Sequence, residues 1–217
     1  MNSDTLKKLH IATPLATVLL SALVVLGGVA AVYTLIRDAK KDHMELVAAL
    51  SKNNQEVVLL KCIDDRVNAP METKVNMTRT IITMAGLKRL DVALICGVIH
   101  VETGGTWKTA LASPAGAVGL MQVMPATGKA YLRAERIDPT KQALVDPVNN
   151  IICGIGALAD FRDQAVDLGL DKDGKDLTIE NFGVTLAMYN QGPRGTKPTA
   201  YSQTVLAAVK KYKELGL

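Results

Sequence analysis

The stretch VALICGVIHV, residues 92–101, runs directly into Glu102 and then into a pair of glycines at 104–105. An apolar run of this length is typical of a helix buried on most sides, and the glycines suit its C-terminal end. The helix dipole disfavours an anion in the last turn and burial disfavours any charge, so we expect the pKa of Glu102 to be raised. A carboxylic acid that keeps its proton near neutral pH can protonate a leaving oxygen. The alternative is an ordinary surface glutamate at a frayed helix end.

Residues 113–125 read SPAGAVGLMQVMP, where closely spaced glycines and prolines predict turns or a small hairpin. The amide, thioether and hydroxyl side chains of this segment suit contacts with a sugar. No Asp or Glu occurs between Thr103 and Ala134, whereas most glycosidases use two carboxyl groups. A second carboxylate can still fold in from elsewhere, for example Asp146. One acid without a local partner favours substrate-assisted chemistry.

Four motifs occur in one order along the chain: Glu102-Thr103, the 113–125 segment, Asn150-Ile151 with Gly154, and AMYNQGP from Ala187. Together they resemble the soluble lytic transglycosylase (SLT) domain, a goose-type lysozyme-like family that cleaves peptidoglycan. The resemblance covers approximately residues 84–212. It implies a mainly α, lysozyme-like fold.

The resemblance also implies a role for each matching residue. Glu102 matches the catalytic acid, which would protonate the oxygen between N-acetylmuramic acid and N-acetylglucosamine. The same group would then accept the proton of the muramic 6-hydroxyl as a 1,6-anhydro ring closes, with the 2-acetamido group stabilising the intermediate. The substrate-binding positions are matched by Ser113, Gln122, Met124, Tyr189 and Asn190.

Three features depart from the family pattern. Thr103 stands where serine is usual, and Gln191 stands where alanine is usual. The segment from Glu102 to Ser113 is longer than usual by about two residues, which a surface loop tolerates. None of these changes removes a catalytic group. A hydrolytic lysozyme on the same fold and a non-catalytic glycan-binding component of a membrane-spanning assembly are the alternatives.

The composition sets limits on partners and cofactors. The formal charge is +4 and the pI is about 8.9, which is compatible with an acidic polymer or an anionic lipid surface. No basic cluster is interleaved with aromatic residues, so nucleic acid is not indicated. The three histidines lie far apart without metal-ligand spacing, and we expect no metal and no cofactor.

Two weaker patterns remain. The segment DKDGKDLTIE, residues 171–180, matches half of an EF-hand calcium loop, and a solvated turn is the favoured interpretation. The three cysteines, Cys62, Cys96 and Cys153, give no closed disulfide framework. A bond between Cys96 and Cys153 stays open in an oxidising compartment.

Residues 11–36 contain no charged side chain and exceed the roughly 20 apolar residues that a transmembrane helix needs. We interpret them as a single-pass anchor after a short tail at 1–10, in preference to a cleaved signal peptide. Lysines flank the span on both sides, so charge does not set its orientation. The proposed substrate lies outside the cytoplasmic membrane, which places the catalytic domain on the periplasmic or cell-wall side.

Residues 37–70 are expected to form a helical stalk, with the domain boundary at Ala69-Pro70 and the catalytic domain over 71–217. Within that domain the patterns predict helices over about 77–85, from an Asp91 cap to Glu102, from Asp146-Pro147 onward, over 179–189 and over 201–213. Residues 118–123 are the strand candidate.

The function predicted is a membrane-anchored lytic transglycosylase. A small, tethered enzyme suits local opening of the wall by a bacteriophage, during entry or lysis, or by a secretion or conjugation machine. Assembly partners in such a complex, and a place in the virion, are part of this hypothesis.

Overall fold

The computed structural model describes residues 54–217, and over this range the secondary structure is helical with two isolated β-bridges. The helices are residues 54–64, α2 (Met71–Lys88), α3 (Val92–Glu102), α4 (Pro125–Ala134), α5 (Lys141–Val145), α6 (Pro147–Asp167), α7 (Ile179–Gln191) and α8 (Ala200–Glu214). The mainly α architecture is confirmed. Among these helices none is long and apolar enough to span a membrane. The expected tail, the anchor at 11–36 and the first part of the stalk lie outside the described residues.

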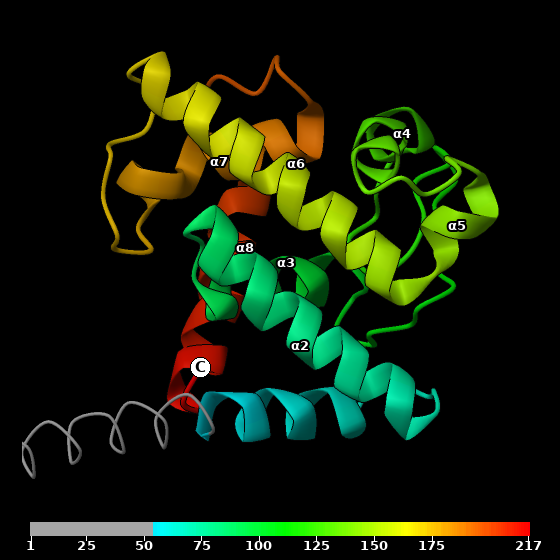
Figure 1. Ribbon diagram of the computed structural model, residues 1–217. Coiled ribbons are helices and arrows are strands. Elements are labelled where there is room, and N and C mark those ends of the chain that lie inside the picture. Colours follow the sequence, from blue (N-terminus) through cyan, green and yellow to red (C-terminus); the bar gives the residue numbers. More distant parts are fainter. Residues whose placement is uncertain (1–53) are drawn as a thin grey trace, which may run out of the picture. The chain divides into compact units, whose positions relative to one another are not determined.

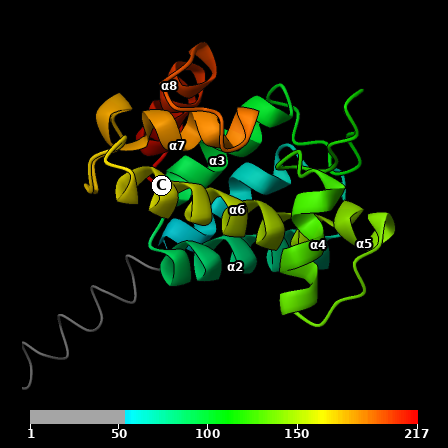
Figure 2. The same ribbon diagram turned by 90° about the horizontal axis from the view of Figure 1, so that it is seen from above.

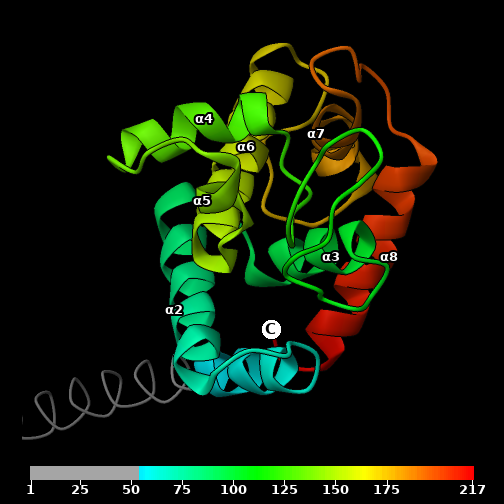
Figure 3. The same cartoon turned by 90° about the vertical axis from the view of Figure 1, so that its right-hand side faces the viewer.

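Helix α3, which the sequence predicts, is buried along most of its length. Every residue from Val92 to Ile99 is buried. Gly97 allows α8 to approach closely, because a Cβ built there would lie 2.8 Å from a Val209 side-chain carbon and 3.2 Å from the Val205 carbonyl oxygen. Figure 3 shows α3 and α8 side by side. This packing fixes the position of Glu102, the last residue of α3.

The ends of the helices follow from local capping chemistry. The side chain of Asp91 accepts a hydrogen bond from the backbone N–H of Ala93, as expected for the residue before α3. Asp146 likewise accepts from the first turn of α6, where Pro147 takes the first helical position. Thr199 forms a reciprocal capping box with Ser202 at the start of α8.

Four helices pack one against the next in the order α2, α6, α7 and α8. Helix α6 contacts both α2 and α7 and lies between them in Figure 2, and α7 in turn contacts α8. Helices α4 and α5 cover one end of α6 (Figure 1). One buried core joins all of these elements, and the site lies where α3, α7 and α8 meet the loop after α3.

The start of the folded unit differs from the boundary expected at Ala69-Pro70. The compact unit begins at Asn54. Leu59 and Ile63 are fully buried and Val67 is 3 % exposed, all within the main core. The chain's C-terminus lies beside this first helix in Figure 1, and Leu217 is also buried. The sequence predicts a helical stalk over residues 37–70, and the part of it from Asn54 onward packs its apolar face in the main core.

Two helices were not expected from the sequence. Helix α4 contains Pro125 and Gly128, and α5, which has five residues, lies between Pro139 and Pro147. The strand candidate at 118–123 forms isolated antiparallel bridges from Val118 to Ala112 and to Val123. The segment 112–123 is therefore a small hairpin with too little pairing to count as a sheet.

Candidate active site

Glu102 is half-buried at the C-terminal end of α3. Its Oε1 accepts a hydrogen bond of 2.5 Å from the phenol of Tyr201 in the first turn of α8. Burial raises the pKa of Glu102, and the hydrogen bond from Tyr201 offsets part of that rise. The expectation of a raised pKa is confirmed in direction, and desolvation is the main cause.

Tyr201 is the residue that the sequence analysis missed. The pKa of its phenol is raised well above the usual range by burial first and by the nearby Glu102 second. The group therefore stays protonated and donates to the carboxylate at any ordinary pH. The only signal in the sequence is an aromatic residue at the start of an amphipathic helix, and nothing in it indicates a partner 99 positions away.

Tyr189, expected near the acid, lies near the end of α7. Its phenol donates a 2.8 Å hydrogen bond to the backbone carbonyl of Met121. Burial raises the pKa of Tyr189, and the negative charge of Glu102 raises it further. Tyr189 thus joins α7 to the hairpin, while Tyr201 makes the direct contact with the acid. Asn190 follows Tyr189 and is exposed to solvent.

The hairpin side chains named from the sequence stabilise the hairpin itself. The Gln122 amide donates to the carbonyls of Gly119, at 2.8 Å, and of Leu111, at 3.3 Å. The Ser113 hydroxyl accepts from the backbone N–H of Ala117 at 3.1 Å. Met124, by contrast, is 43 % exposed immediately before α4. Its exposed side chain is able to contact a ligand.

Asn150 joins the hairpin to α6. The side chain is fully buried, and its Oδ1 accepts from the backbone N–H of Met121 at 2.9 Å. Its Nδ2 donates to the carbonyls of Val118, at 2.9 Å, and Leu144, at 3.0 Å. The sequence placed Asn150 in a motif without a role, and the structure assigns it this one.

Two glycines allow this close contact. A Cβ on Gly154 would lie 2.4 Å from the Met121 sulfur, and one on Gly119 would lie 2.3 Å from the Asn150 amide nitrogen. Gly119 also has a φ of 79°, which favours glycine. The hairpin is therefore held rigidly against α6.

A second carboxylate is not seen to act on Glu102 within residues 54–217. The pKa of Glu102 responds there to burial and to Tyr201. Asp146, the candidate named from the sequence, has an oxygen that accepts from the backbone N–H groups of Val148 and Asn149 at the start of α6. It serves as a helix cap.

The segment considered for calcium has a different role. The carboxylate of Asp171 is buried and accepts hydrogen bonds from the backbone N–H groups of Val184 and Thr185 and from the Thr185 hydroxyl. Glu180 pairs with Lys172. Among residues 54–217, no group of three or more His, Cys, Asp or Glu side chains is placed to hold a metal ion. The three cysteines are all free thiols, so Cys96 and Cys153 are not joined.

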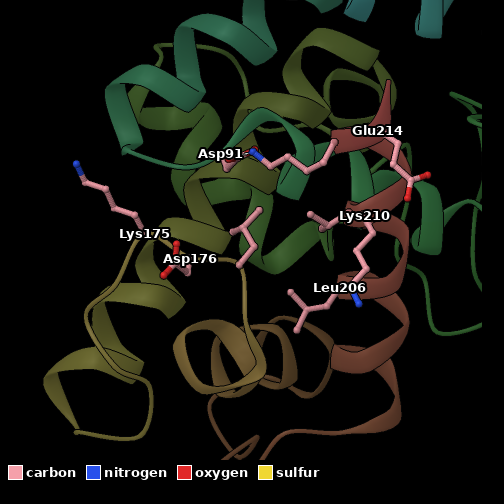
Figure 4. Close-up of a pocket in the computed structure, with 9 residues that line it drawn as sticks. Asp91, Lys175, Asp176, Leu206, Lys210 and Glu214 are labelled. Carbon is pink, nitrogen blue, oxygen red and sulfur yellow. Dashed lines mark hydrogen bonds and ion pairs between the residues drawn. The ribbon is translucent and has the colours of Figure 1, made fainter. Parts of the chain in front are cut away.

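A pocket of about 430 Å³ lies at the opposite end of α3, between α8 and the segment before α7 (Figure 4). Asp91 and Lys213 form an ion pair in its wall. Leu177, Leu206 and Val209 supply its apolar surface. None of the glycan-binding residues named from the sequence lines it.

A half-buried carboxylic acid with a raised pKa is suited to protonating the leaving oxygen when a glycosidic bond breaks. The model of the transglycosylase SLT domain family matches residues 79–207. The chain belongs to this family.

Similar proteins include the membrane-bound lytic murein transglycosylase C of Histophilus somni, from strains 2336 and 129Pt. Each is 35% identical over 111 residues, which is 50% of this chain and 28% of the relative, so the chain spans well under half of their length. A solved structure of the lytic transglycosylase Slt from Pseudomonas aeruginosa, an inactive mutant, is 24% identical. The matched region covers 63% of this chain and 24% of the Slt chain, with a TM-score of 0.49.

Proposed function

We propose that this protein is a peptidoglycan lytic transglycosylase with Glu102 as its single catalytic acid and base. The observation that carries the proposal is the state of Glu102 in a chain of the SLT family. The carboxyl group is half-buried, its pKa is raised, and the Tyr201 phenol holds one oxygen at 2.5 Å. The other oxygen, Oε2, is left to carry the proton toward the glycosidic oxygen.

The reaction proceeds in two proton transfers at the same group. Protonated Glu102 donates its proton to the oxygen between N-acetylmuramic acid and N-acetylglucosamine as the bond breaks. The resulting carboxylate is stabilised by the hydrogen bond from Tyr201, which is stronger to a charged acceptor. It then accepts the proton of the muramic 6-hydroxyl as that oxygen attacks the anomeric carbon and closes the 1,6-anhydro ring.

The 2-acetamido group of the sugar takes the place of a second carboxylate. This step is supported by the lack of Asp and Glu between Thr103 and Ala134 and by the position of Asp146, which caps α6. Met124, Asn190 and the faces of Tyr189 and Tyr201 would contact the glycan, and Ser113 and Gln122 would act by holding the hairpin that carries Met124.

The test is mass spectrometry of fragments released from purified sacculi by residues 54–217, with Glu102→Gln as the control. Fragments ending in anhydromuramic acid, absent from the control, support the proposal. Hydrated reducing ends would make the protein a lysozyme. Binding without release by either protein would favour a glycan-binding structural component.

We further propose that residues 11–36 anchor the enzyme in the membrane with its domain on the cell-wall side. The support is the uncharged length of this segment and the name of the Histophilus somni relative, which is membrane-bound. Fractionation of the full chain and of a chain starting at residue 37 tests the anchor. Recovery of both in the soluble fraction would contradict it.

The setting we propose is local opening of the wall by a bacteriophage or by a secretion or conjugation machine, because a tethered enzyme acts only near its point of attachment. Cross-linking in cells should capture an assembly partner. A protein that diffuses freely and cross-links to nothing would count against this setting.

A further inference from the structure

Trp107, the single tryptophan of the chain, lies five residues after the catalytic acid and is fully buried. Its φ is 52°, in the left-handed region that bulky residues rarely adopt. Such a conformation is strained, so its surroundings must hold it in place. It belongs to the longer loop that departs from the family pattern.

Hydrogen bonds hold this loop at several points. The Trp107 backbone N–H donates to the Thr103 hydroxyl at 3.1 Å, and that hydroxyl donates to the Ile99 carbonyl at 2.7 Å. The Gly105 N–H donates to the His100 carbonyl at 2.6 Å. A Cβ on Gly105 would lie 3.1 Å from Cε1 of the His100 ring. The loop therefore closes over the imidazole.

The Trp107 indole is the first group in a chain of side-chain hydrogen bonds. Its Nε1 lies 3.1 Å from the hydroxyl of Tyr212, and that hydroxyl lies 3.3 Å from Nδ1 of His100. The His100 ring also meets the Tyr212 ring edge to face, with centroids 5.9 Å apart. Tyr212 is 3 % exposed, so its hydroxyl has little access to water.

The direction of these bonds depends on the charge of His100. An indole N–H can only donate, so the Tyr212 oxygen accepts from Trp107 and its own O–H is left to donate to Nδ1. An imidazole with its proton on Nδ1 would leave this buried O–H without an acceptor, so the Nε2–H tautomer is favoured. Nδ1 has a lone pair for this bond only in a neutral imidazole that carries its proton on Nε2. A protonated imidazole would present a second donor to the Tyr212 oxygen and leave the buried O–H without an acceptor.

The groups that face His100 favour its neutral form. Burial lowers the pKa of His100 from its usual 6.5, and the cations Lys211, on α8, and Arg66, after the first helix, lower it further. Burial raises the pKa of Tyr212 to about 12, so the phenol keeps its proton. The native arrangement therefore persists to a lower pH than the titration of a solvent-exposed histidine would allow.

We propose that Trp107, Tyr212 and His100 form a positioning element that fixes the loop after Glu102 while His100 is neutral, and that protonation of His100 loosens this loop. The loop connects the catalytic acid to the hairpin at Ser113, so loosening it displaces both. The consequence for catalysis rests on the proposed function, whereas the change in the loop does not.

The experiment measures tryptophan emission of the full chain between about pH 8 and pH 5, which covers the titration of histidine. Because Trp107 is the only tryptophan, the emission reports on this loop alone. We expect an inflection below pH 6.5 in the native protein and none in His100→Gln, whose amide does not titrate. Circular dichroism at each pH verifies that the helices remain.

A second variant separates titration from a merely structural role. Lys211→Gln removes an exposed cation that opposes protonation of His100, so the inflection should move to higher pH. Lys210→Gln, the exposed neighbour that does not act on His100, is the matched control and should leave the inflection in place. A flat emission profile in the native protein, the same inflection in His100→Gln, or no shift in Lys211→Gln would each overturn the proposal.

A third experiment measures the activity of Tyr212→Phe, which keeps the ring and removes the hydrogen bonds to Trp107 and His100. We expect kcat to fall about 10- to 100-fold with little change in KM, because small displacements of catalytic groups act on the rate. An unchanged kcat together with the predicted emission changes would show that the loop responds to pH without positioning Glu102. No activity in any variant or in the native protein would instead refute the proposed function.

Discussion

Residues 54–69 should be indispensable for folding of the catalytic domain. The perturbation is a chain that starts at Pro70, compared with one that starts at Asn54. The deletion removes Leu59, Ile63 and Val67, which are at most 3 % exposed in the main core. Full burial of each such side chain contributes about 1.5–3 kcal/mol, so the three together contribute about 5–9 kcal/mol as an upper estimate.

This loss is comparable with the whole stability of a typical domain, about 5–15 kcal/mol. Urea denaturation followed by circular dichroism should therefore show the shorter chain unfolded or nearly so in the absence of denaturant. If its free energy of unfolding came within about 1 kcal/mol of the longer chain, the first helix would be an independent stalk after all.

A matched pair of substitutions on this helix checks the reasoning without a deletion. Ile63→Ala, at a fully buried position, should lower the free energy of unfolding by about 2–5 kcal/mol. Val57→Ala, at a position 64 % exposed, should change it by less than about 0.5 kcal/mol. Equal effects from the two would contradict burial of this face.

Four further predictions concern the site and the elements that support it. Tyr201→Phe removes the hydrogen bond that lowers the pKa of Glu102, so this pKa should rise. The basic limb of the pH profile of kcat should then move to higher pH. An unmoved limb would contradict the assignment of Glu102 as the catalytic acid. The raised pKa of Glu102 means that the folded state binds this proton more tightly, so the stability it contributes is present at low pH and is lost as pH rises through the folded pKa. Glu102→Gln should consequently have a higher Tm than the native protein near pH 8, measured by calorimetry, and a lower value would refute the sign. Asn150→Ala should lower the free energy of unfolding by about 3 kcal/mol because three buried hydrogen bonds lose a partner, and urea titration would detect even half of this. Gly154→Ala should lower the free energy of unfolding by about 1–3 kcal/mol, because its Cβ would overlap with the hairpin. Gly86→Ala, at a helical position with open space around it, should raise the free energy of unfolding by about 0.4–1 kcal/mol.

The features predicted correctly from the sequence depend on neighbours along the chain. The caps at Asp91 and Asp146 use backbone N–H groups two or three residues away, so a short pattern contains all the information. The raised pKa of Glu102 followed from its place at the end of an apolar helix. Local chemistry was sufficient in each case.

The features that were missed depend on packing between distant segments. Tyr201 reaches Glu102 only because α8 packs along α3, and that contact has no trace in either segment alone. The apolar face of residues 54–67 has the same spacing whether a partner helix or the domain core covers it. The hydrogen bonds of Gln122 and Ser113 with the hairpin backbone likewise depend on how the segment folds back on itself.

Asn150, which joins the hairpin to α6, limits which positions of the hairpin tolerate substitution. An amide at position 150 supplies one acceptor and two donor hydrogens, and all three are engaged. Aspartate cannot donate, and glutamine is one methylene too long for a site without free volume, so a library of substitutions should return asparagine there. Pro114 and Ala115, at the tip of the same hairpin, are exposed. The base of the hairpin is thus expected to tolerate few substitutions, while its exposed tip is free to vary.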